Sequence, residues 1–333
     1  MDLFDQVFGV FEQDIEFELR AGLLVPWADY WLNPRQLRGS DFLMRWSQGA
    51  WSELRLKEAL NRTGVFYALP YGPSGAAPDD DPREAELYFL RLEQAGLRKL
   101  KRPDLLIFRA AQKDEIESIV REIASGQLAS TVNEDFEKAV VELPFTSEEN
   151  PLMRQLLDKA FLAVECENSL WVAKKMPSYG QPLRPMKRLA GKAGLSKSAV
   201  LPTVIVKDED RGRLKAWQGQ HNTPIHIWHV FYDLAFGIAL DEVERLIAEG
   251  FIEPKQQIFQ APGGQTTTKA TYNIYYHYAY ELGEAHERPS LVAAHIIDKN
   301  GHVLPYVKFE GGSLTISEQA MQVLDQTANQ QNK

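Results

Sequence analysis

The sequence of 333 residues contains a single cysteine, Cys166. One cysteine excludes an intramolecular disulfide framework and any zinc site built from several thiolates. No run of apolar residues approaches the ~18 that a membrane span requires, and the N-terminal stretch MDLFDQVFGVFEQDIE lacks the positive charge that opens a secretory signal. We therefore expect a cytoplasmic protein that does not enter a membrane.

The common nucleotide-binding and hydrolase fingerprints are also missing. The chain has no GxGxxG dinucleotide motif, no GxxxxGK[ST] phosphate loop, no GxSxG nucleophile elbow and no HExxH zinc motif. We accordingly expect no nucleotide cofactor.

Positive charge is scarce overall but concentrated in one window. The chain carries 37 Lys and Arg against 46 Asp and Glu, a net charge of -9. Between Lys174 and Lys215, however, eleven basic residues face three acidic ones. Phosphate affinity comes from Lys and Arg, and the distribution of charge matters more than its sum. The window therefore favours contact with a polyanion such as DNA, and a solvated basic face is the alternative interpretation.

The periodicity of apolar residues predicts an α/β fold. We expect a central mixed β-sheet flanked by helices, with a helical N-terminal part and β-rich C-terminal additions. The strands expected before the β-rich stretch 256–312 are residues 64–71, 103–108, 161–168, 199–207 and 225–232. The expected helices are 3–22, 40–64 with a break near Gly49, 81–94, 112–125, 132–140, 150–160, 169–175, 240–250 and 315–327. The strands at 199–207 and 225–232 should lie beside the earlier ones in one sheet.

Three regions follow from this pattern. Residues 1–97 form a helical region packed on the core, and residues 98–235 form the core itself, with a helical insertion at 112–160. Residues 236–333 form a β-rich C-terminal region suited to DNA recognition or dimerisation.

Two short apolar runs place acidic residues at their ends. They are PDLLIF, which contains Asp104, and FLAVECEN, which contains Glu165 and Glu167. Residues two apart on a strand point to the same face, so both glutamates would project together. Three converging carboxylates repel one another unless a cation lies among them, and a divalent metal fills that role. The two runs therefore predict a metal-dependent site.

A proline-aspartate pair before an apolar strand, followed by a strand that ends in ExE, resembles the PD-(D/E)XK nuclease superfamily and, within it, the type II restriction endonucleases. The continuation ENSLWVAKKMPSYG is similar to AccI-type enzymes, and the resemblance covers roughly residues 100–235. It implies a restriction-endonuclease-like core and Mg²⁺-dependent cleavage of double-stranded DNA at a short specific site. It also implies that Asp104, Glu165, Glu167 and the backbone carbonyl of Cys166 hold one or two Mg²⁺ ions.

The family pattern usually has lysine where this chain has Glu167, so the general base stays open. A minority of restriction enzymes also carry glutamate there. In other members of the superfamily the working lysine lies on the following helix, which would make it Lys174 or Lys175. Many members add a glutamate from a helix before the first motif, and Glu53 is the candidate here, with a solvated helix carboxylate as the alternative.

Further residues are candidates for contact with DNA. Positive charge directly before Asp104 suits a phosphate beside the metal, and the proline- and glycine-rich stretch 177–198 is suited to follow a DNA backbone. Gln, Thr and Lys in a polar loop near residue 265 are side chains that read base edges. The candidates are Lys101, Arg102, Arg184, Lys187, Arg188, Lys192, Lys197, Gln265, Thr267 and Lys269.

Two rival functions remain open. The nuclease hypothesis also carries an expectation about the symmetry of the protein. A symmetrical DNA site favours a C2 homodimer. Glu167 in place of lysine leaves room for a non-catalytic DNA-binding protein with a nuclease-like fold. Paired carboxylates also suit a glycoside hydrolase, which needs them roughly 5–9 Å apart but gives the basic window no role. His226 and His229, three apart on a predicted strand, would face opposite sides and so could not bind one metal together; they are expected to be buried or interfacial structural residues.

Overall fold

The computed structural model describes residues 41–73, 101–127, 136–260, 266–297 and 303–331. The predicted helices at 3–22 and 81–94 and the side chain of Gln265 lie outside these residues.

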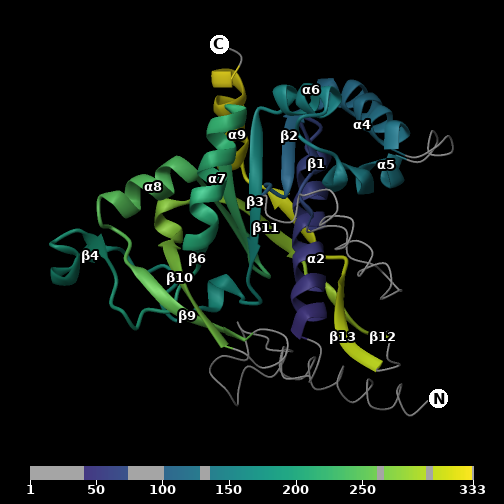
Figure 1. The fold of residues 1–333 in the computed structure, drawn as a ribbon. Helices are drawn as coiled ribbons and strands as arrows, with labels where there is room; N and C mark the ends of the chain where they lie inside the picture. Colours follow the sequence, from purple (N-terminus) through teal and green to yellow (C-terminus); the bar gives the residue numbers. More distant parts are fainter. Residues whose placement is uncertain (1–40, 74–100, 128–135, 261–265, 298–302, 332–333) are drawn as a thin grey trace.

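A seven-stranded mixed sheet forms the centre of the molecule (Figure 1). Its strand order is β1-β2-β3-β7-β8-β11-β14. Only β3 and β7 run parallel among the described strands of this sheet; the other neighbours are antiparallel. The strands are β1 (Phe66–Pro70), β2 (Leu105–Arg109), β3 (Leu162–Asn168), β7 (Ile225–Val230), β8 (Leu234–Ala239), β11 (Tyr280–Glu287) and β14 (Ser313–Ile316). The predicted class, a mixed sheet flanked by helices, is confirmed.

Helices cover both faces of this sheet. They are α2 (Asp41–Arg62), α4 (Lys113–Gln127), α5 (Phe136–Glu142), α6 (Pro151–Lys159), α7 (Asp208–His221), α8 (Leu240–Ala248) and α9 (Glu318–Gln331). Helices α2 and α9 pack on one face, here called the α2 face, with strand residues such as Leu162 and Val164. The opposite face, here called the α7 face, packs α4–α8 against residues such as Ala163 and Ile227. Alternation along each strand thus decides which face a side chain reaches.

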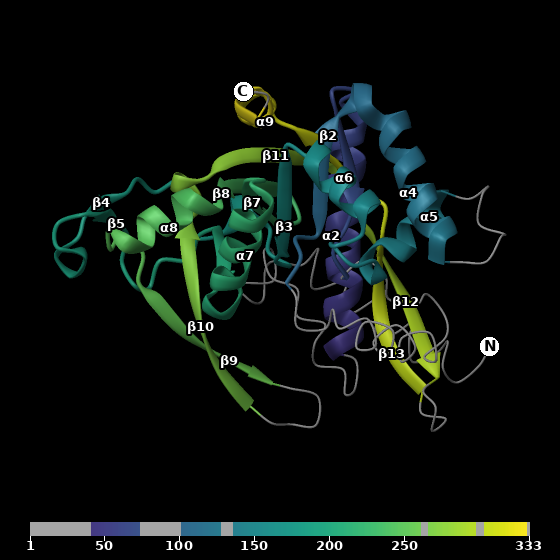
Figure 2. The ribbon, with the colours of Figure 1, turned by 45° about the horizontal axis from the view of Figure 1, so that its top comes forward.

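Smaller strand pairs extend from the central sheet. A three-stranded sheet has the order β6-β10-β9, and β12–β13 and β4–β5 form separate hairpins. Their bounds are β4 (Arg184–Pro185), β5 (Ala193–Gly194), β6 (Thr203–Lys207), β9 (Pro254–Gln260), β10 (Thr266–Tyr275), β12 (Ser290–Ile297) and β13 (Val303–Glu310). The β9–β10 and β12–β13 ribbons both project past the end of the central sheet at which β3 finishes (Figure 2).

Local sequence signals placed several elements correctly. The Asn150 side chain accepts a hydrogen bond from the Leu152 amide at 2.9 Å and begins α6 beside Pro151, as a helix cap does. Strand β1, helices α4 and α8, and the pairing of β7 beside β3 also agree with prediction.

Three expectations were wrong, and one helix was not predicted. Helix α2 continues through Gly49 without a break. Strand β6 belongs to the smaller sheet because it pairs with β10. Residues 169–175 form only a short 3-10 turn, η6 (Ala173–Lys175), because the carboxylate of Asp233 binds the amides of Ala173 and Lys174 at 2.6 and 2.9 Å. Helix α7 carries no clear apolar periodicity, since only Leu214 and Trp217 are buried, and it was not predicted.

Within the described part of the chain, no helix is both long and apolar enough to cross a membrane.

Candidate functional site

The two acid-bearing segments lie next to each other in the central sheet. Strands β2 and β3 pair with Leu105 opposite Val164, and the amide of Asp104 donates to the Val164 carbonyl at 2.8 Å. Side chains at every second position of a strand point to the same face. Asp104 is therefore on the face of Leu106, and Glu165 and Glu167 are on the face of Ala163. Leu106 and Ala163 both pack on the α7 face, so all three carboxylates belong to it. The structure therefore brings together segments that are about sixty residues apart in the sequence.

The backbone around Asp104 is fixed from several sides. Its carboxylate oxygen Oδ2 accepts the amide hydrogen of Cys166 at 2.6 Å. Its carbonyl accepts hydrogen bonds from the amides of Tyr71 at 2.8 Å and Gly72 at 3.2 Å. A Cβ atom at Gly72 would lie 2.8 Å from the Pro103 carbonyl oxygen, so only glycine allows this approach. The aspartate is thus held in place before any ligand arrives.

Glu165 is the most strongly perturbed of the carboxylates. Only 4% of it is exposed, and its Oε1 atom forms an ion pair with the ammonium of Lys101. Its Oε2 atom is buried without a hydrogen-bond partner. Burial first, and then the charge of Asp104, raise the pKa of Glu165 to about 8, against the opposing effect of Lys101. Burial lowers the pKa of Lys101, but the charges of Glu165 and Asp104 outweigh it, so the lysine stays charged.

Glu167 has a second lysine as its partner. The Nζ atom of Lys207, the last residue of β6, lies 2.8 Å from Glu167 Oε1. Burial lowers the pKa of Lys207, but Glu167 raises it by more. Asp210, in the first turn of α7, adds negative charge near Lys101 as well as Lys207. Sequence reasoning missed Lys207 and Asp210, because no local pattern shows that β6 ends against β3.

Each glutamate therefore has a lysine partner in addition to its neighbouring carboxylates. The described residues contain no group of three or more His, Cys, Asp or Glu side chains arranged to hold a metal ion. The two ammonium groups supply the positive charge that three neighbouring carboxylates require.

Cys166 and Glu53 belong to the other side of the sheet. The Cys166 side chain packs into the cluster of the α2 face, and its thiol pKa is raised well above the usual value by burial, then by Asp104 and Glu53. Glu53 lies on α2, which covers that same face. The structure therefore places Glu53 near Cys166, on the α2 side of β3.

Lys174 and Lys175 lie on the short turn η6 instead of on a helix. Both are exposed, and the Lys174 ammonium forms an ion pair with Glu284 of β11. The turn therefore brings Lys174 to β11.

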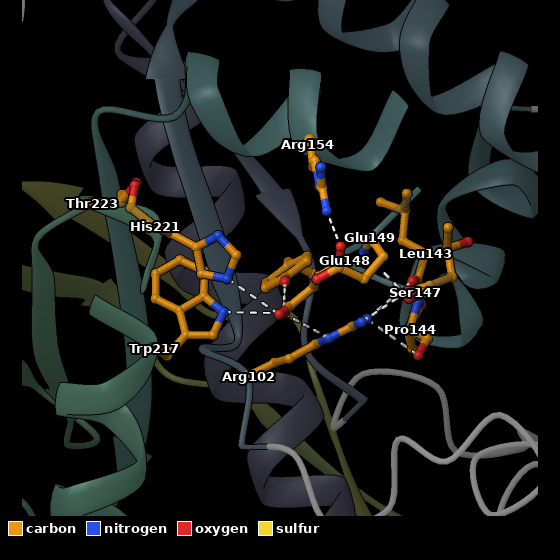
Figure 3. Close-up of polar contacts among 12 residues, drawn as sticks. Arg102, Leu143, Pro144, Ser147, Glu148, Glu149, Arg154, Trp217, His221 and Thr223 are labelled. Carbon is orange, nitrogen blue, oxygen red and sulfur yellow. Dashed lines mark hydrogen bonds and ion pairs between the residues drawn. The ribbon is translucent and has the colours of Figure 1, made fainter. Parts of the chain in front are cut away.

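Arg102 is part of a buried polar network centred on Glu148 (Figure 3). Its guanidinium lies 3.0 Å from Glu148 Oε1, and it also donates to the Thr146 carbonyl at 2.8 Å. Trp217 Nε1 and His221 Nε2 of α7 lie 3.1 and 3.2 Å from the same carboxylate. With 3% exposure, Arg102 has almost no surface to offer to a phosphate. The network instead joins the segment before Asp104 to helix α7.

Burial tends to keep the Glu148 carboxyl protonated, but the groups around it prevail. Hydrogen bonds from His221 and Tyr71, together with the charge of Arg102, lower its pKa to about 2. The carboxylate is therefore ionised at neutral pH, and its interaction with Arg102 is that of two charges in a buried setting.

Some of the remaining DNA-binding candidates have exposed side chains, and others bind neighbouring residues of the protein. Arg184, Lys187 and Lys197 are exposed around the β4–β5 hairpin. Arg188 lies 2.7 Å from Glu253 and donates to the Leu195 carbonyl at 2.5 Å. Lys192 contacts the Glu249 carbonyl, Lys269 lies 2.5 Å from Glu209, and Thr267 belongs to β10.

The two histidines of β7 are buried, as predicted, and they serve the packing of the sheet. His229 accepts the Ile205 amide hydrogen on Nδ1 at 3.3 Å, so Nε2 carries the proton and donates to Ser169 Oγ at 2.8 Å. Burial lowers the pKa of His229 to about 3 and that of His226 to about 4. Both rings are neutral at physiological pH, and His229 does not activate Ser169, because it is the donor in that bond.

Comparison of the chain with protein-family models, with curated proteins and with solved structures finds no match.

Proposed function

We propose that this protein is a Mg²⁺-dependent endonuclease that cleaves double-stranded DNA at a short specific site, in the manner of the type II restriction endonucleases. The observation that carries the proposal is the gathering of Asp104, Glu165 and Glu167 on one sheet face with Lys101 and Lys207 in direct contact. Carboxylates beside lysines form the combination that phosphodiester hydrolysis needs, since it requires both a hard cation and positive charge near the phosphate.

The oxygen donors present suit a hard divalent cation in kind, although no three of the described side chains are arranged around one ion position. Glu165 Oε2 is buried without a partner, which costs free energy unless another group binds it. We propose that Asp104 and Glu165 hold one or two Mg²⁺ ions, with Glu167 and the Cys166 carbonyl as further ligands. When bound, Mg²⁺ polarises phosphoryl oxygens and makes water more acidic.

The other roles in the proposed reaction belong to side chains of the protein itself. Asp104 is fixed by the Cys166 amide, so its position does not depend on a ligand. Lys101 and Lys207 stay protonated because their carboxylate partners outweigh burial. They act as positive charges that stabilise the additional negative charge that develops on the phosphoryl oxygens in the transition state, not as bases. Glu167 retains 18% side-chain exposure, against 5% for Glu165. It is therefore the carboxylate best placed to orient an attacking water and accept its proton.

The proposal extends to the fold and the assembly. The helix-flanked mixed sheet, with Asp104 directly before β2 and the two glutamates on β3, supports assignment to a restriction-endonuclease-like core. A symmetrical cutting site would require a C2 homodimer, which presents two copies of the site to the two DNA strands.

A non-catalytic DNA-binding protein is the second candidate. The observation in its favour is that both glutamates already have lysine partners, an arrangement that neutralises the site without a metal. In that case the basic window would bind DNA and no strand would be cut.

One experiment separates the two. A plasmid of known sequence is incubated with the wild-type chain, with Asp104→Asn and with Asp158→Asn, an exposed aspartate on α6, with and without Mg²⁺. The proposal expects discrete fragments from the wild type and Asp158→Asn only with Mg²⁺, and none from Asp104→Asn. Retention of DNA without cutting favours the binding protein. If the wild-type chain does not interact with DNA at low salt, both proposals fail and a carboxylate-dependent glycosidase becomes the next candidate to assay.

A further inference from the structure

The β9–β10 ribbon is anchored directly at the carboxylate site. The C-terminal half of β10 pairs with β6, and Thr271 lies opposite Lys207. Lys207 is the residue whose ammonium binds Glu167. The position of the ribbon relative to the carboxylates is therefore set by continuous backbone pairing and by one side-chain contact.

Beyond this anchor, the ribbon continues past the end of β6. Strand β6 ends at Lys207, but β10 begins at Thr266 and pairs with β9 along its N-terminal half. The five residues from Thr271 back to Thr266 span about 17 Å at ~3.4 Å per residue. Figures 1 and 2 both show this part extending past the end of β3. A duplex rises about 3.4 Å per base pair, so this part of the ribbon covers about five base pairs.

The chemistry of the ribbon differs from that of the chain as a whole. Residues 254–280 contain no Asp or Glu, although the chain has 46 acidic residues. The strands are instead rich in amide, hydroxyl and amine side chains, which are Lys255, Gln256, Gln257, Gln260, Thr266, Thr267, Thr268 and Lys269. Such a segment meets little electrostatic repulsion from phosphates, and its amides and hydroxyls can both donate to and accept from base edges.

One face of the ribbon presents such groups to solvent. Gln256 pairs with Ala270 and Ile258 pairs with Thr268, so Gln256 and Thr268 lie on the same face. Both residues are exposed. Lys255, on the opposite face, is exposed as well, whereas Lys269 is bound to Glu209.

We propose that the β9–β10 ribbon enters the major groove of the DNA and reads the bases within about five base pairs of the scissile phosphate. The major groove admits a two-stranded β-ribbon, and the anchor at Lys207 places that ribbon beside the cutting site. Gln256 and Thr268 contact base edges, and Lys255 contacts the phosphate backbone. The inference rests on the proposed function, because it locates the sequence-reading element of the same enzyme.

The test compares the double variant Gln256→Ala, Thr268→Ala with a matched control, Thr315→Ala, Gln322→Ala, whose residues are exposed on β14 and α9. Each protein is given a library of duplexes with randomised sequence. One arm contains Mg²⁺, and the fragment ends are sequenced. The other arm omits Mg²⁺, and the retained duplexes are sequenced, so recognition is measured whether or not cleavage occurs.

The wild type and the control should select the same bases near the cut. The double variant should lose roughly 5- to 150-fold of discrimination at one or two of those positions, the effect of one good base contact. Unchanged base preference in the double variant overturns the inference while leaving the nuclease proposal intact. If the wild type selects no sequence in either arm, the inference is likewise overturned.

A second variant checks the phosphate contact. Lys255→Ala should weaken binding about equally on all sequences and reduce the slope of log affinity against log salt concentration by about 1. An unchanged slope contradicts the placement of the ribbon on DNA.

Discussion

The substitution Glu165→Gln removes the ionisable group on which the site depends and keeps its shape. Burial and the charge of Asp104 raise the pKa of Glu165 from 4.5 to about 8. A factor of ten in proton affinity corresponds to about 1.4 kcal/mol, so this displacement corresponds to about 5 kcal/mol. Because the surroundings relax around the ionised carboxylate and water reaches it, we expect about 2 kcal/mol of this to be realised.

The pH dependence has a definite sign. Near pH 4 the carboxyl is protonated in both the folded and the unfolded chain, and Gln closely resembles a neutral carboxylic acid. As the pH rises from about 4.5 to about 8, the unfolded chain releases the proton and the folded chain retains it. The free energy of unfolding of the wild type therefore falls over this range through Glu165, whereas that of the variant does not.

Urea denaturation at pH 5, 7 and 9 measures this difference. The variant should be about as stable as the wild type at pH 5 and about 2 kcal/mol more stable at pH 9, in the absence of divalent metal. Glu122→Gln, an exposed position on α4, serves as the control and should show no such trend. A stability difference that is independent of pH, or that favours the wild type as pH rises, refutes the reasoning about the buried carboxylate.

Three further predictions concern other parts of the molecule. Asp104→Asn should reduce cleavage by about three orders of magnitude, because it removes a metal ligand worth several kcal/mol to the transition state. Filter binding should show that the affinity for DNA is unchanged or higher, and normal cutting would contradict the assignment of Asp104 to the site. Lys187→Ala with Lys197→Ala should lower the salt slope of DNA binding by about 2, measured between 50 and 200 mM salt, and an unchanged slope excludes these lysines from the contact surface. Glu148→Gln should destabilise the chain by about 3–5 kcal/mol in urea at pH 7, because it leaves the buried charge of Arg102 without its partner; a loss below 1 kcal/mol contradicts the role of the network.

Local sequence predicted the strands that carry the acids, because their burial requires apolar runs of five to seven residues. It also predicted that Glu165 and Glu167 share a face, because the alternation of a strand is a local property. The adjacency of β2 and β3 followed only from the resemblance and from the need of carboxylates for a shared cation, since nothing local in either segment specifies its neighbour.

The lysines of the site show what local sequence could not predict. Lys101 and Arg102 are consecutive and similar in chemistry, yet one pairs with Glu165 and the other turns into the buried network of Glu148. Lys207 reaches Glu167 because β6 belongs to a second sheet that ends against β3. Each outcome is set by contacts between segments forty or more residues apart, which no window of neighbouring residues encodes.

Helix α2 shows a different limit. Its glycine at position 49 predicted a break on helix propensity alone. In the structure the helix continues through this glycine and packs against the sheet. A Cβ atom at position 49 would lie 3.9 Å from the Asn168 side chain, which is an ordinary contact distance. Tertiary contact outweighed a local cost of about 1 kcal/mol.

The parallel alignment of β3 and β7 requires the chain to return across the sheet before it can form the second strand. That return path, residues 169–224, contains the whole basic window from Lys174 to Lys215. Changes in the exposed parts of the path would alter its charged surface while the acid-bearing strands keep their alignment. Lys207, Trp217 and His221 are the exceptions, because they tie the path to Glu167 and Glu148.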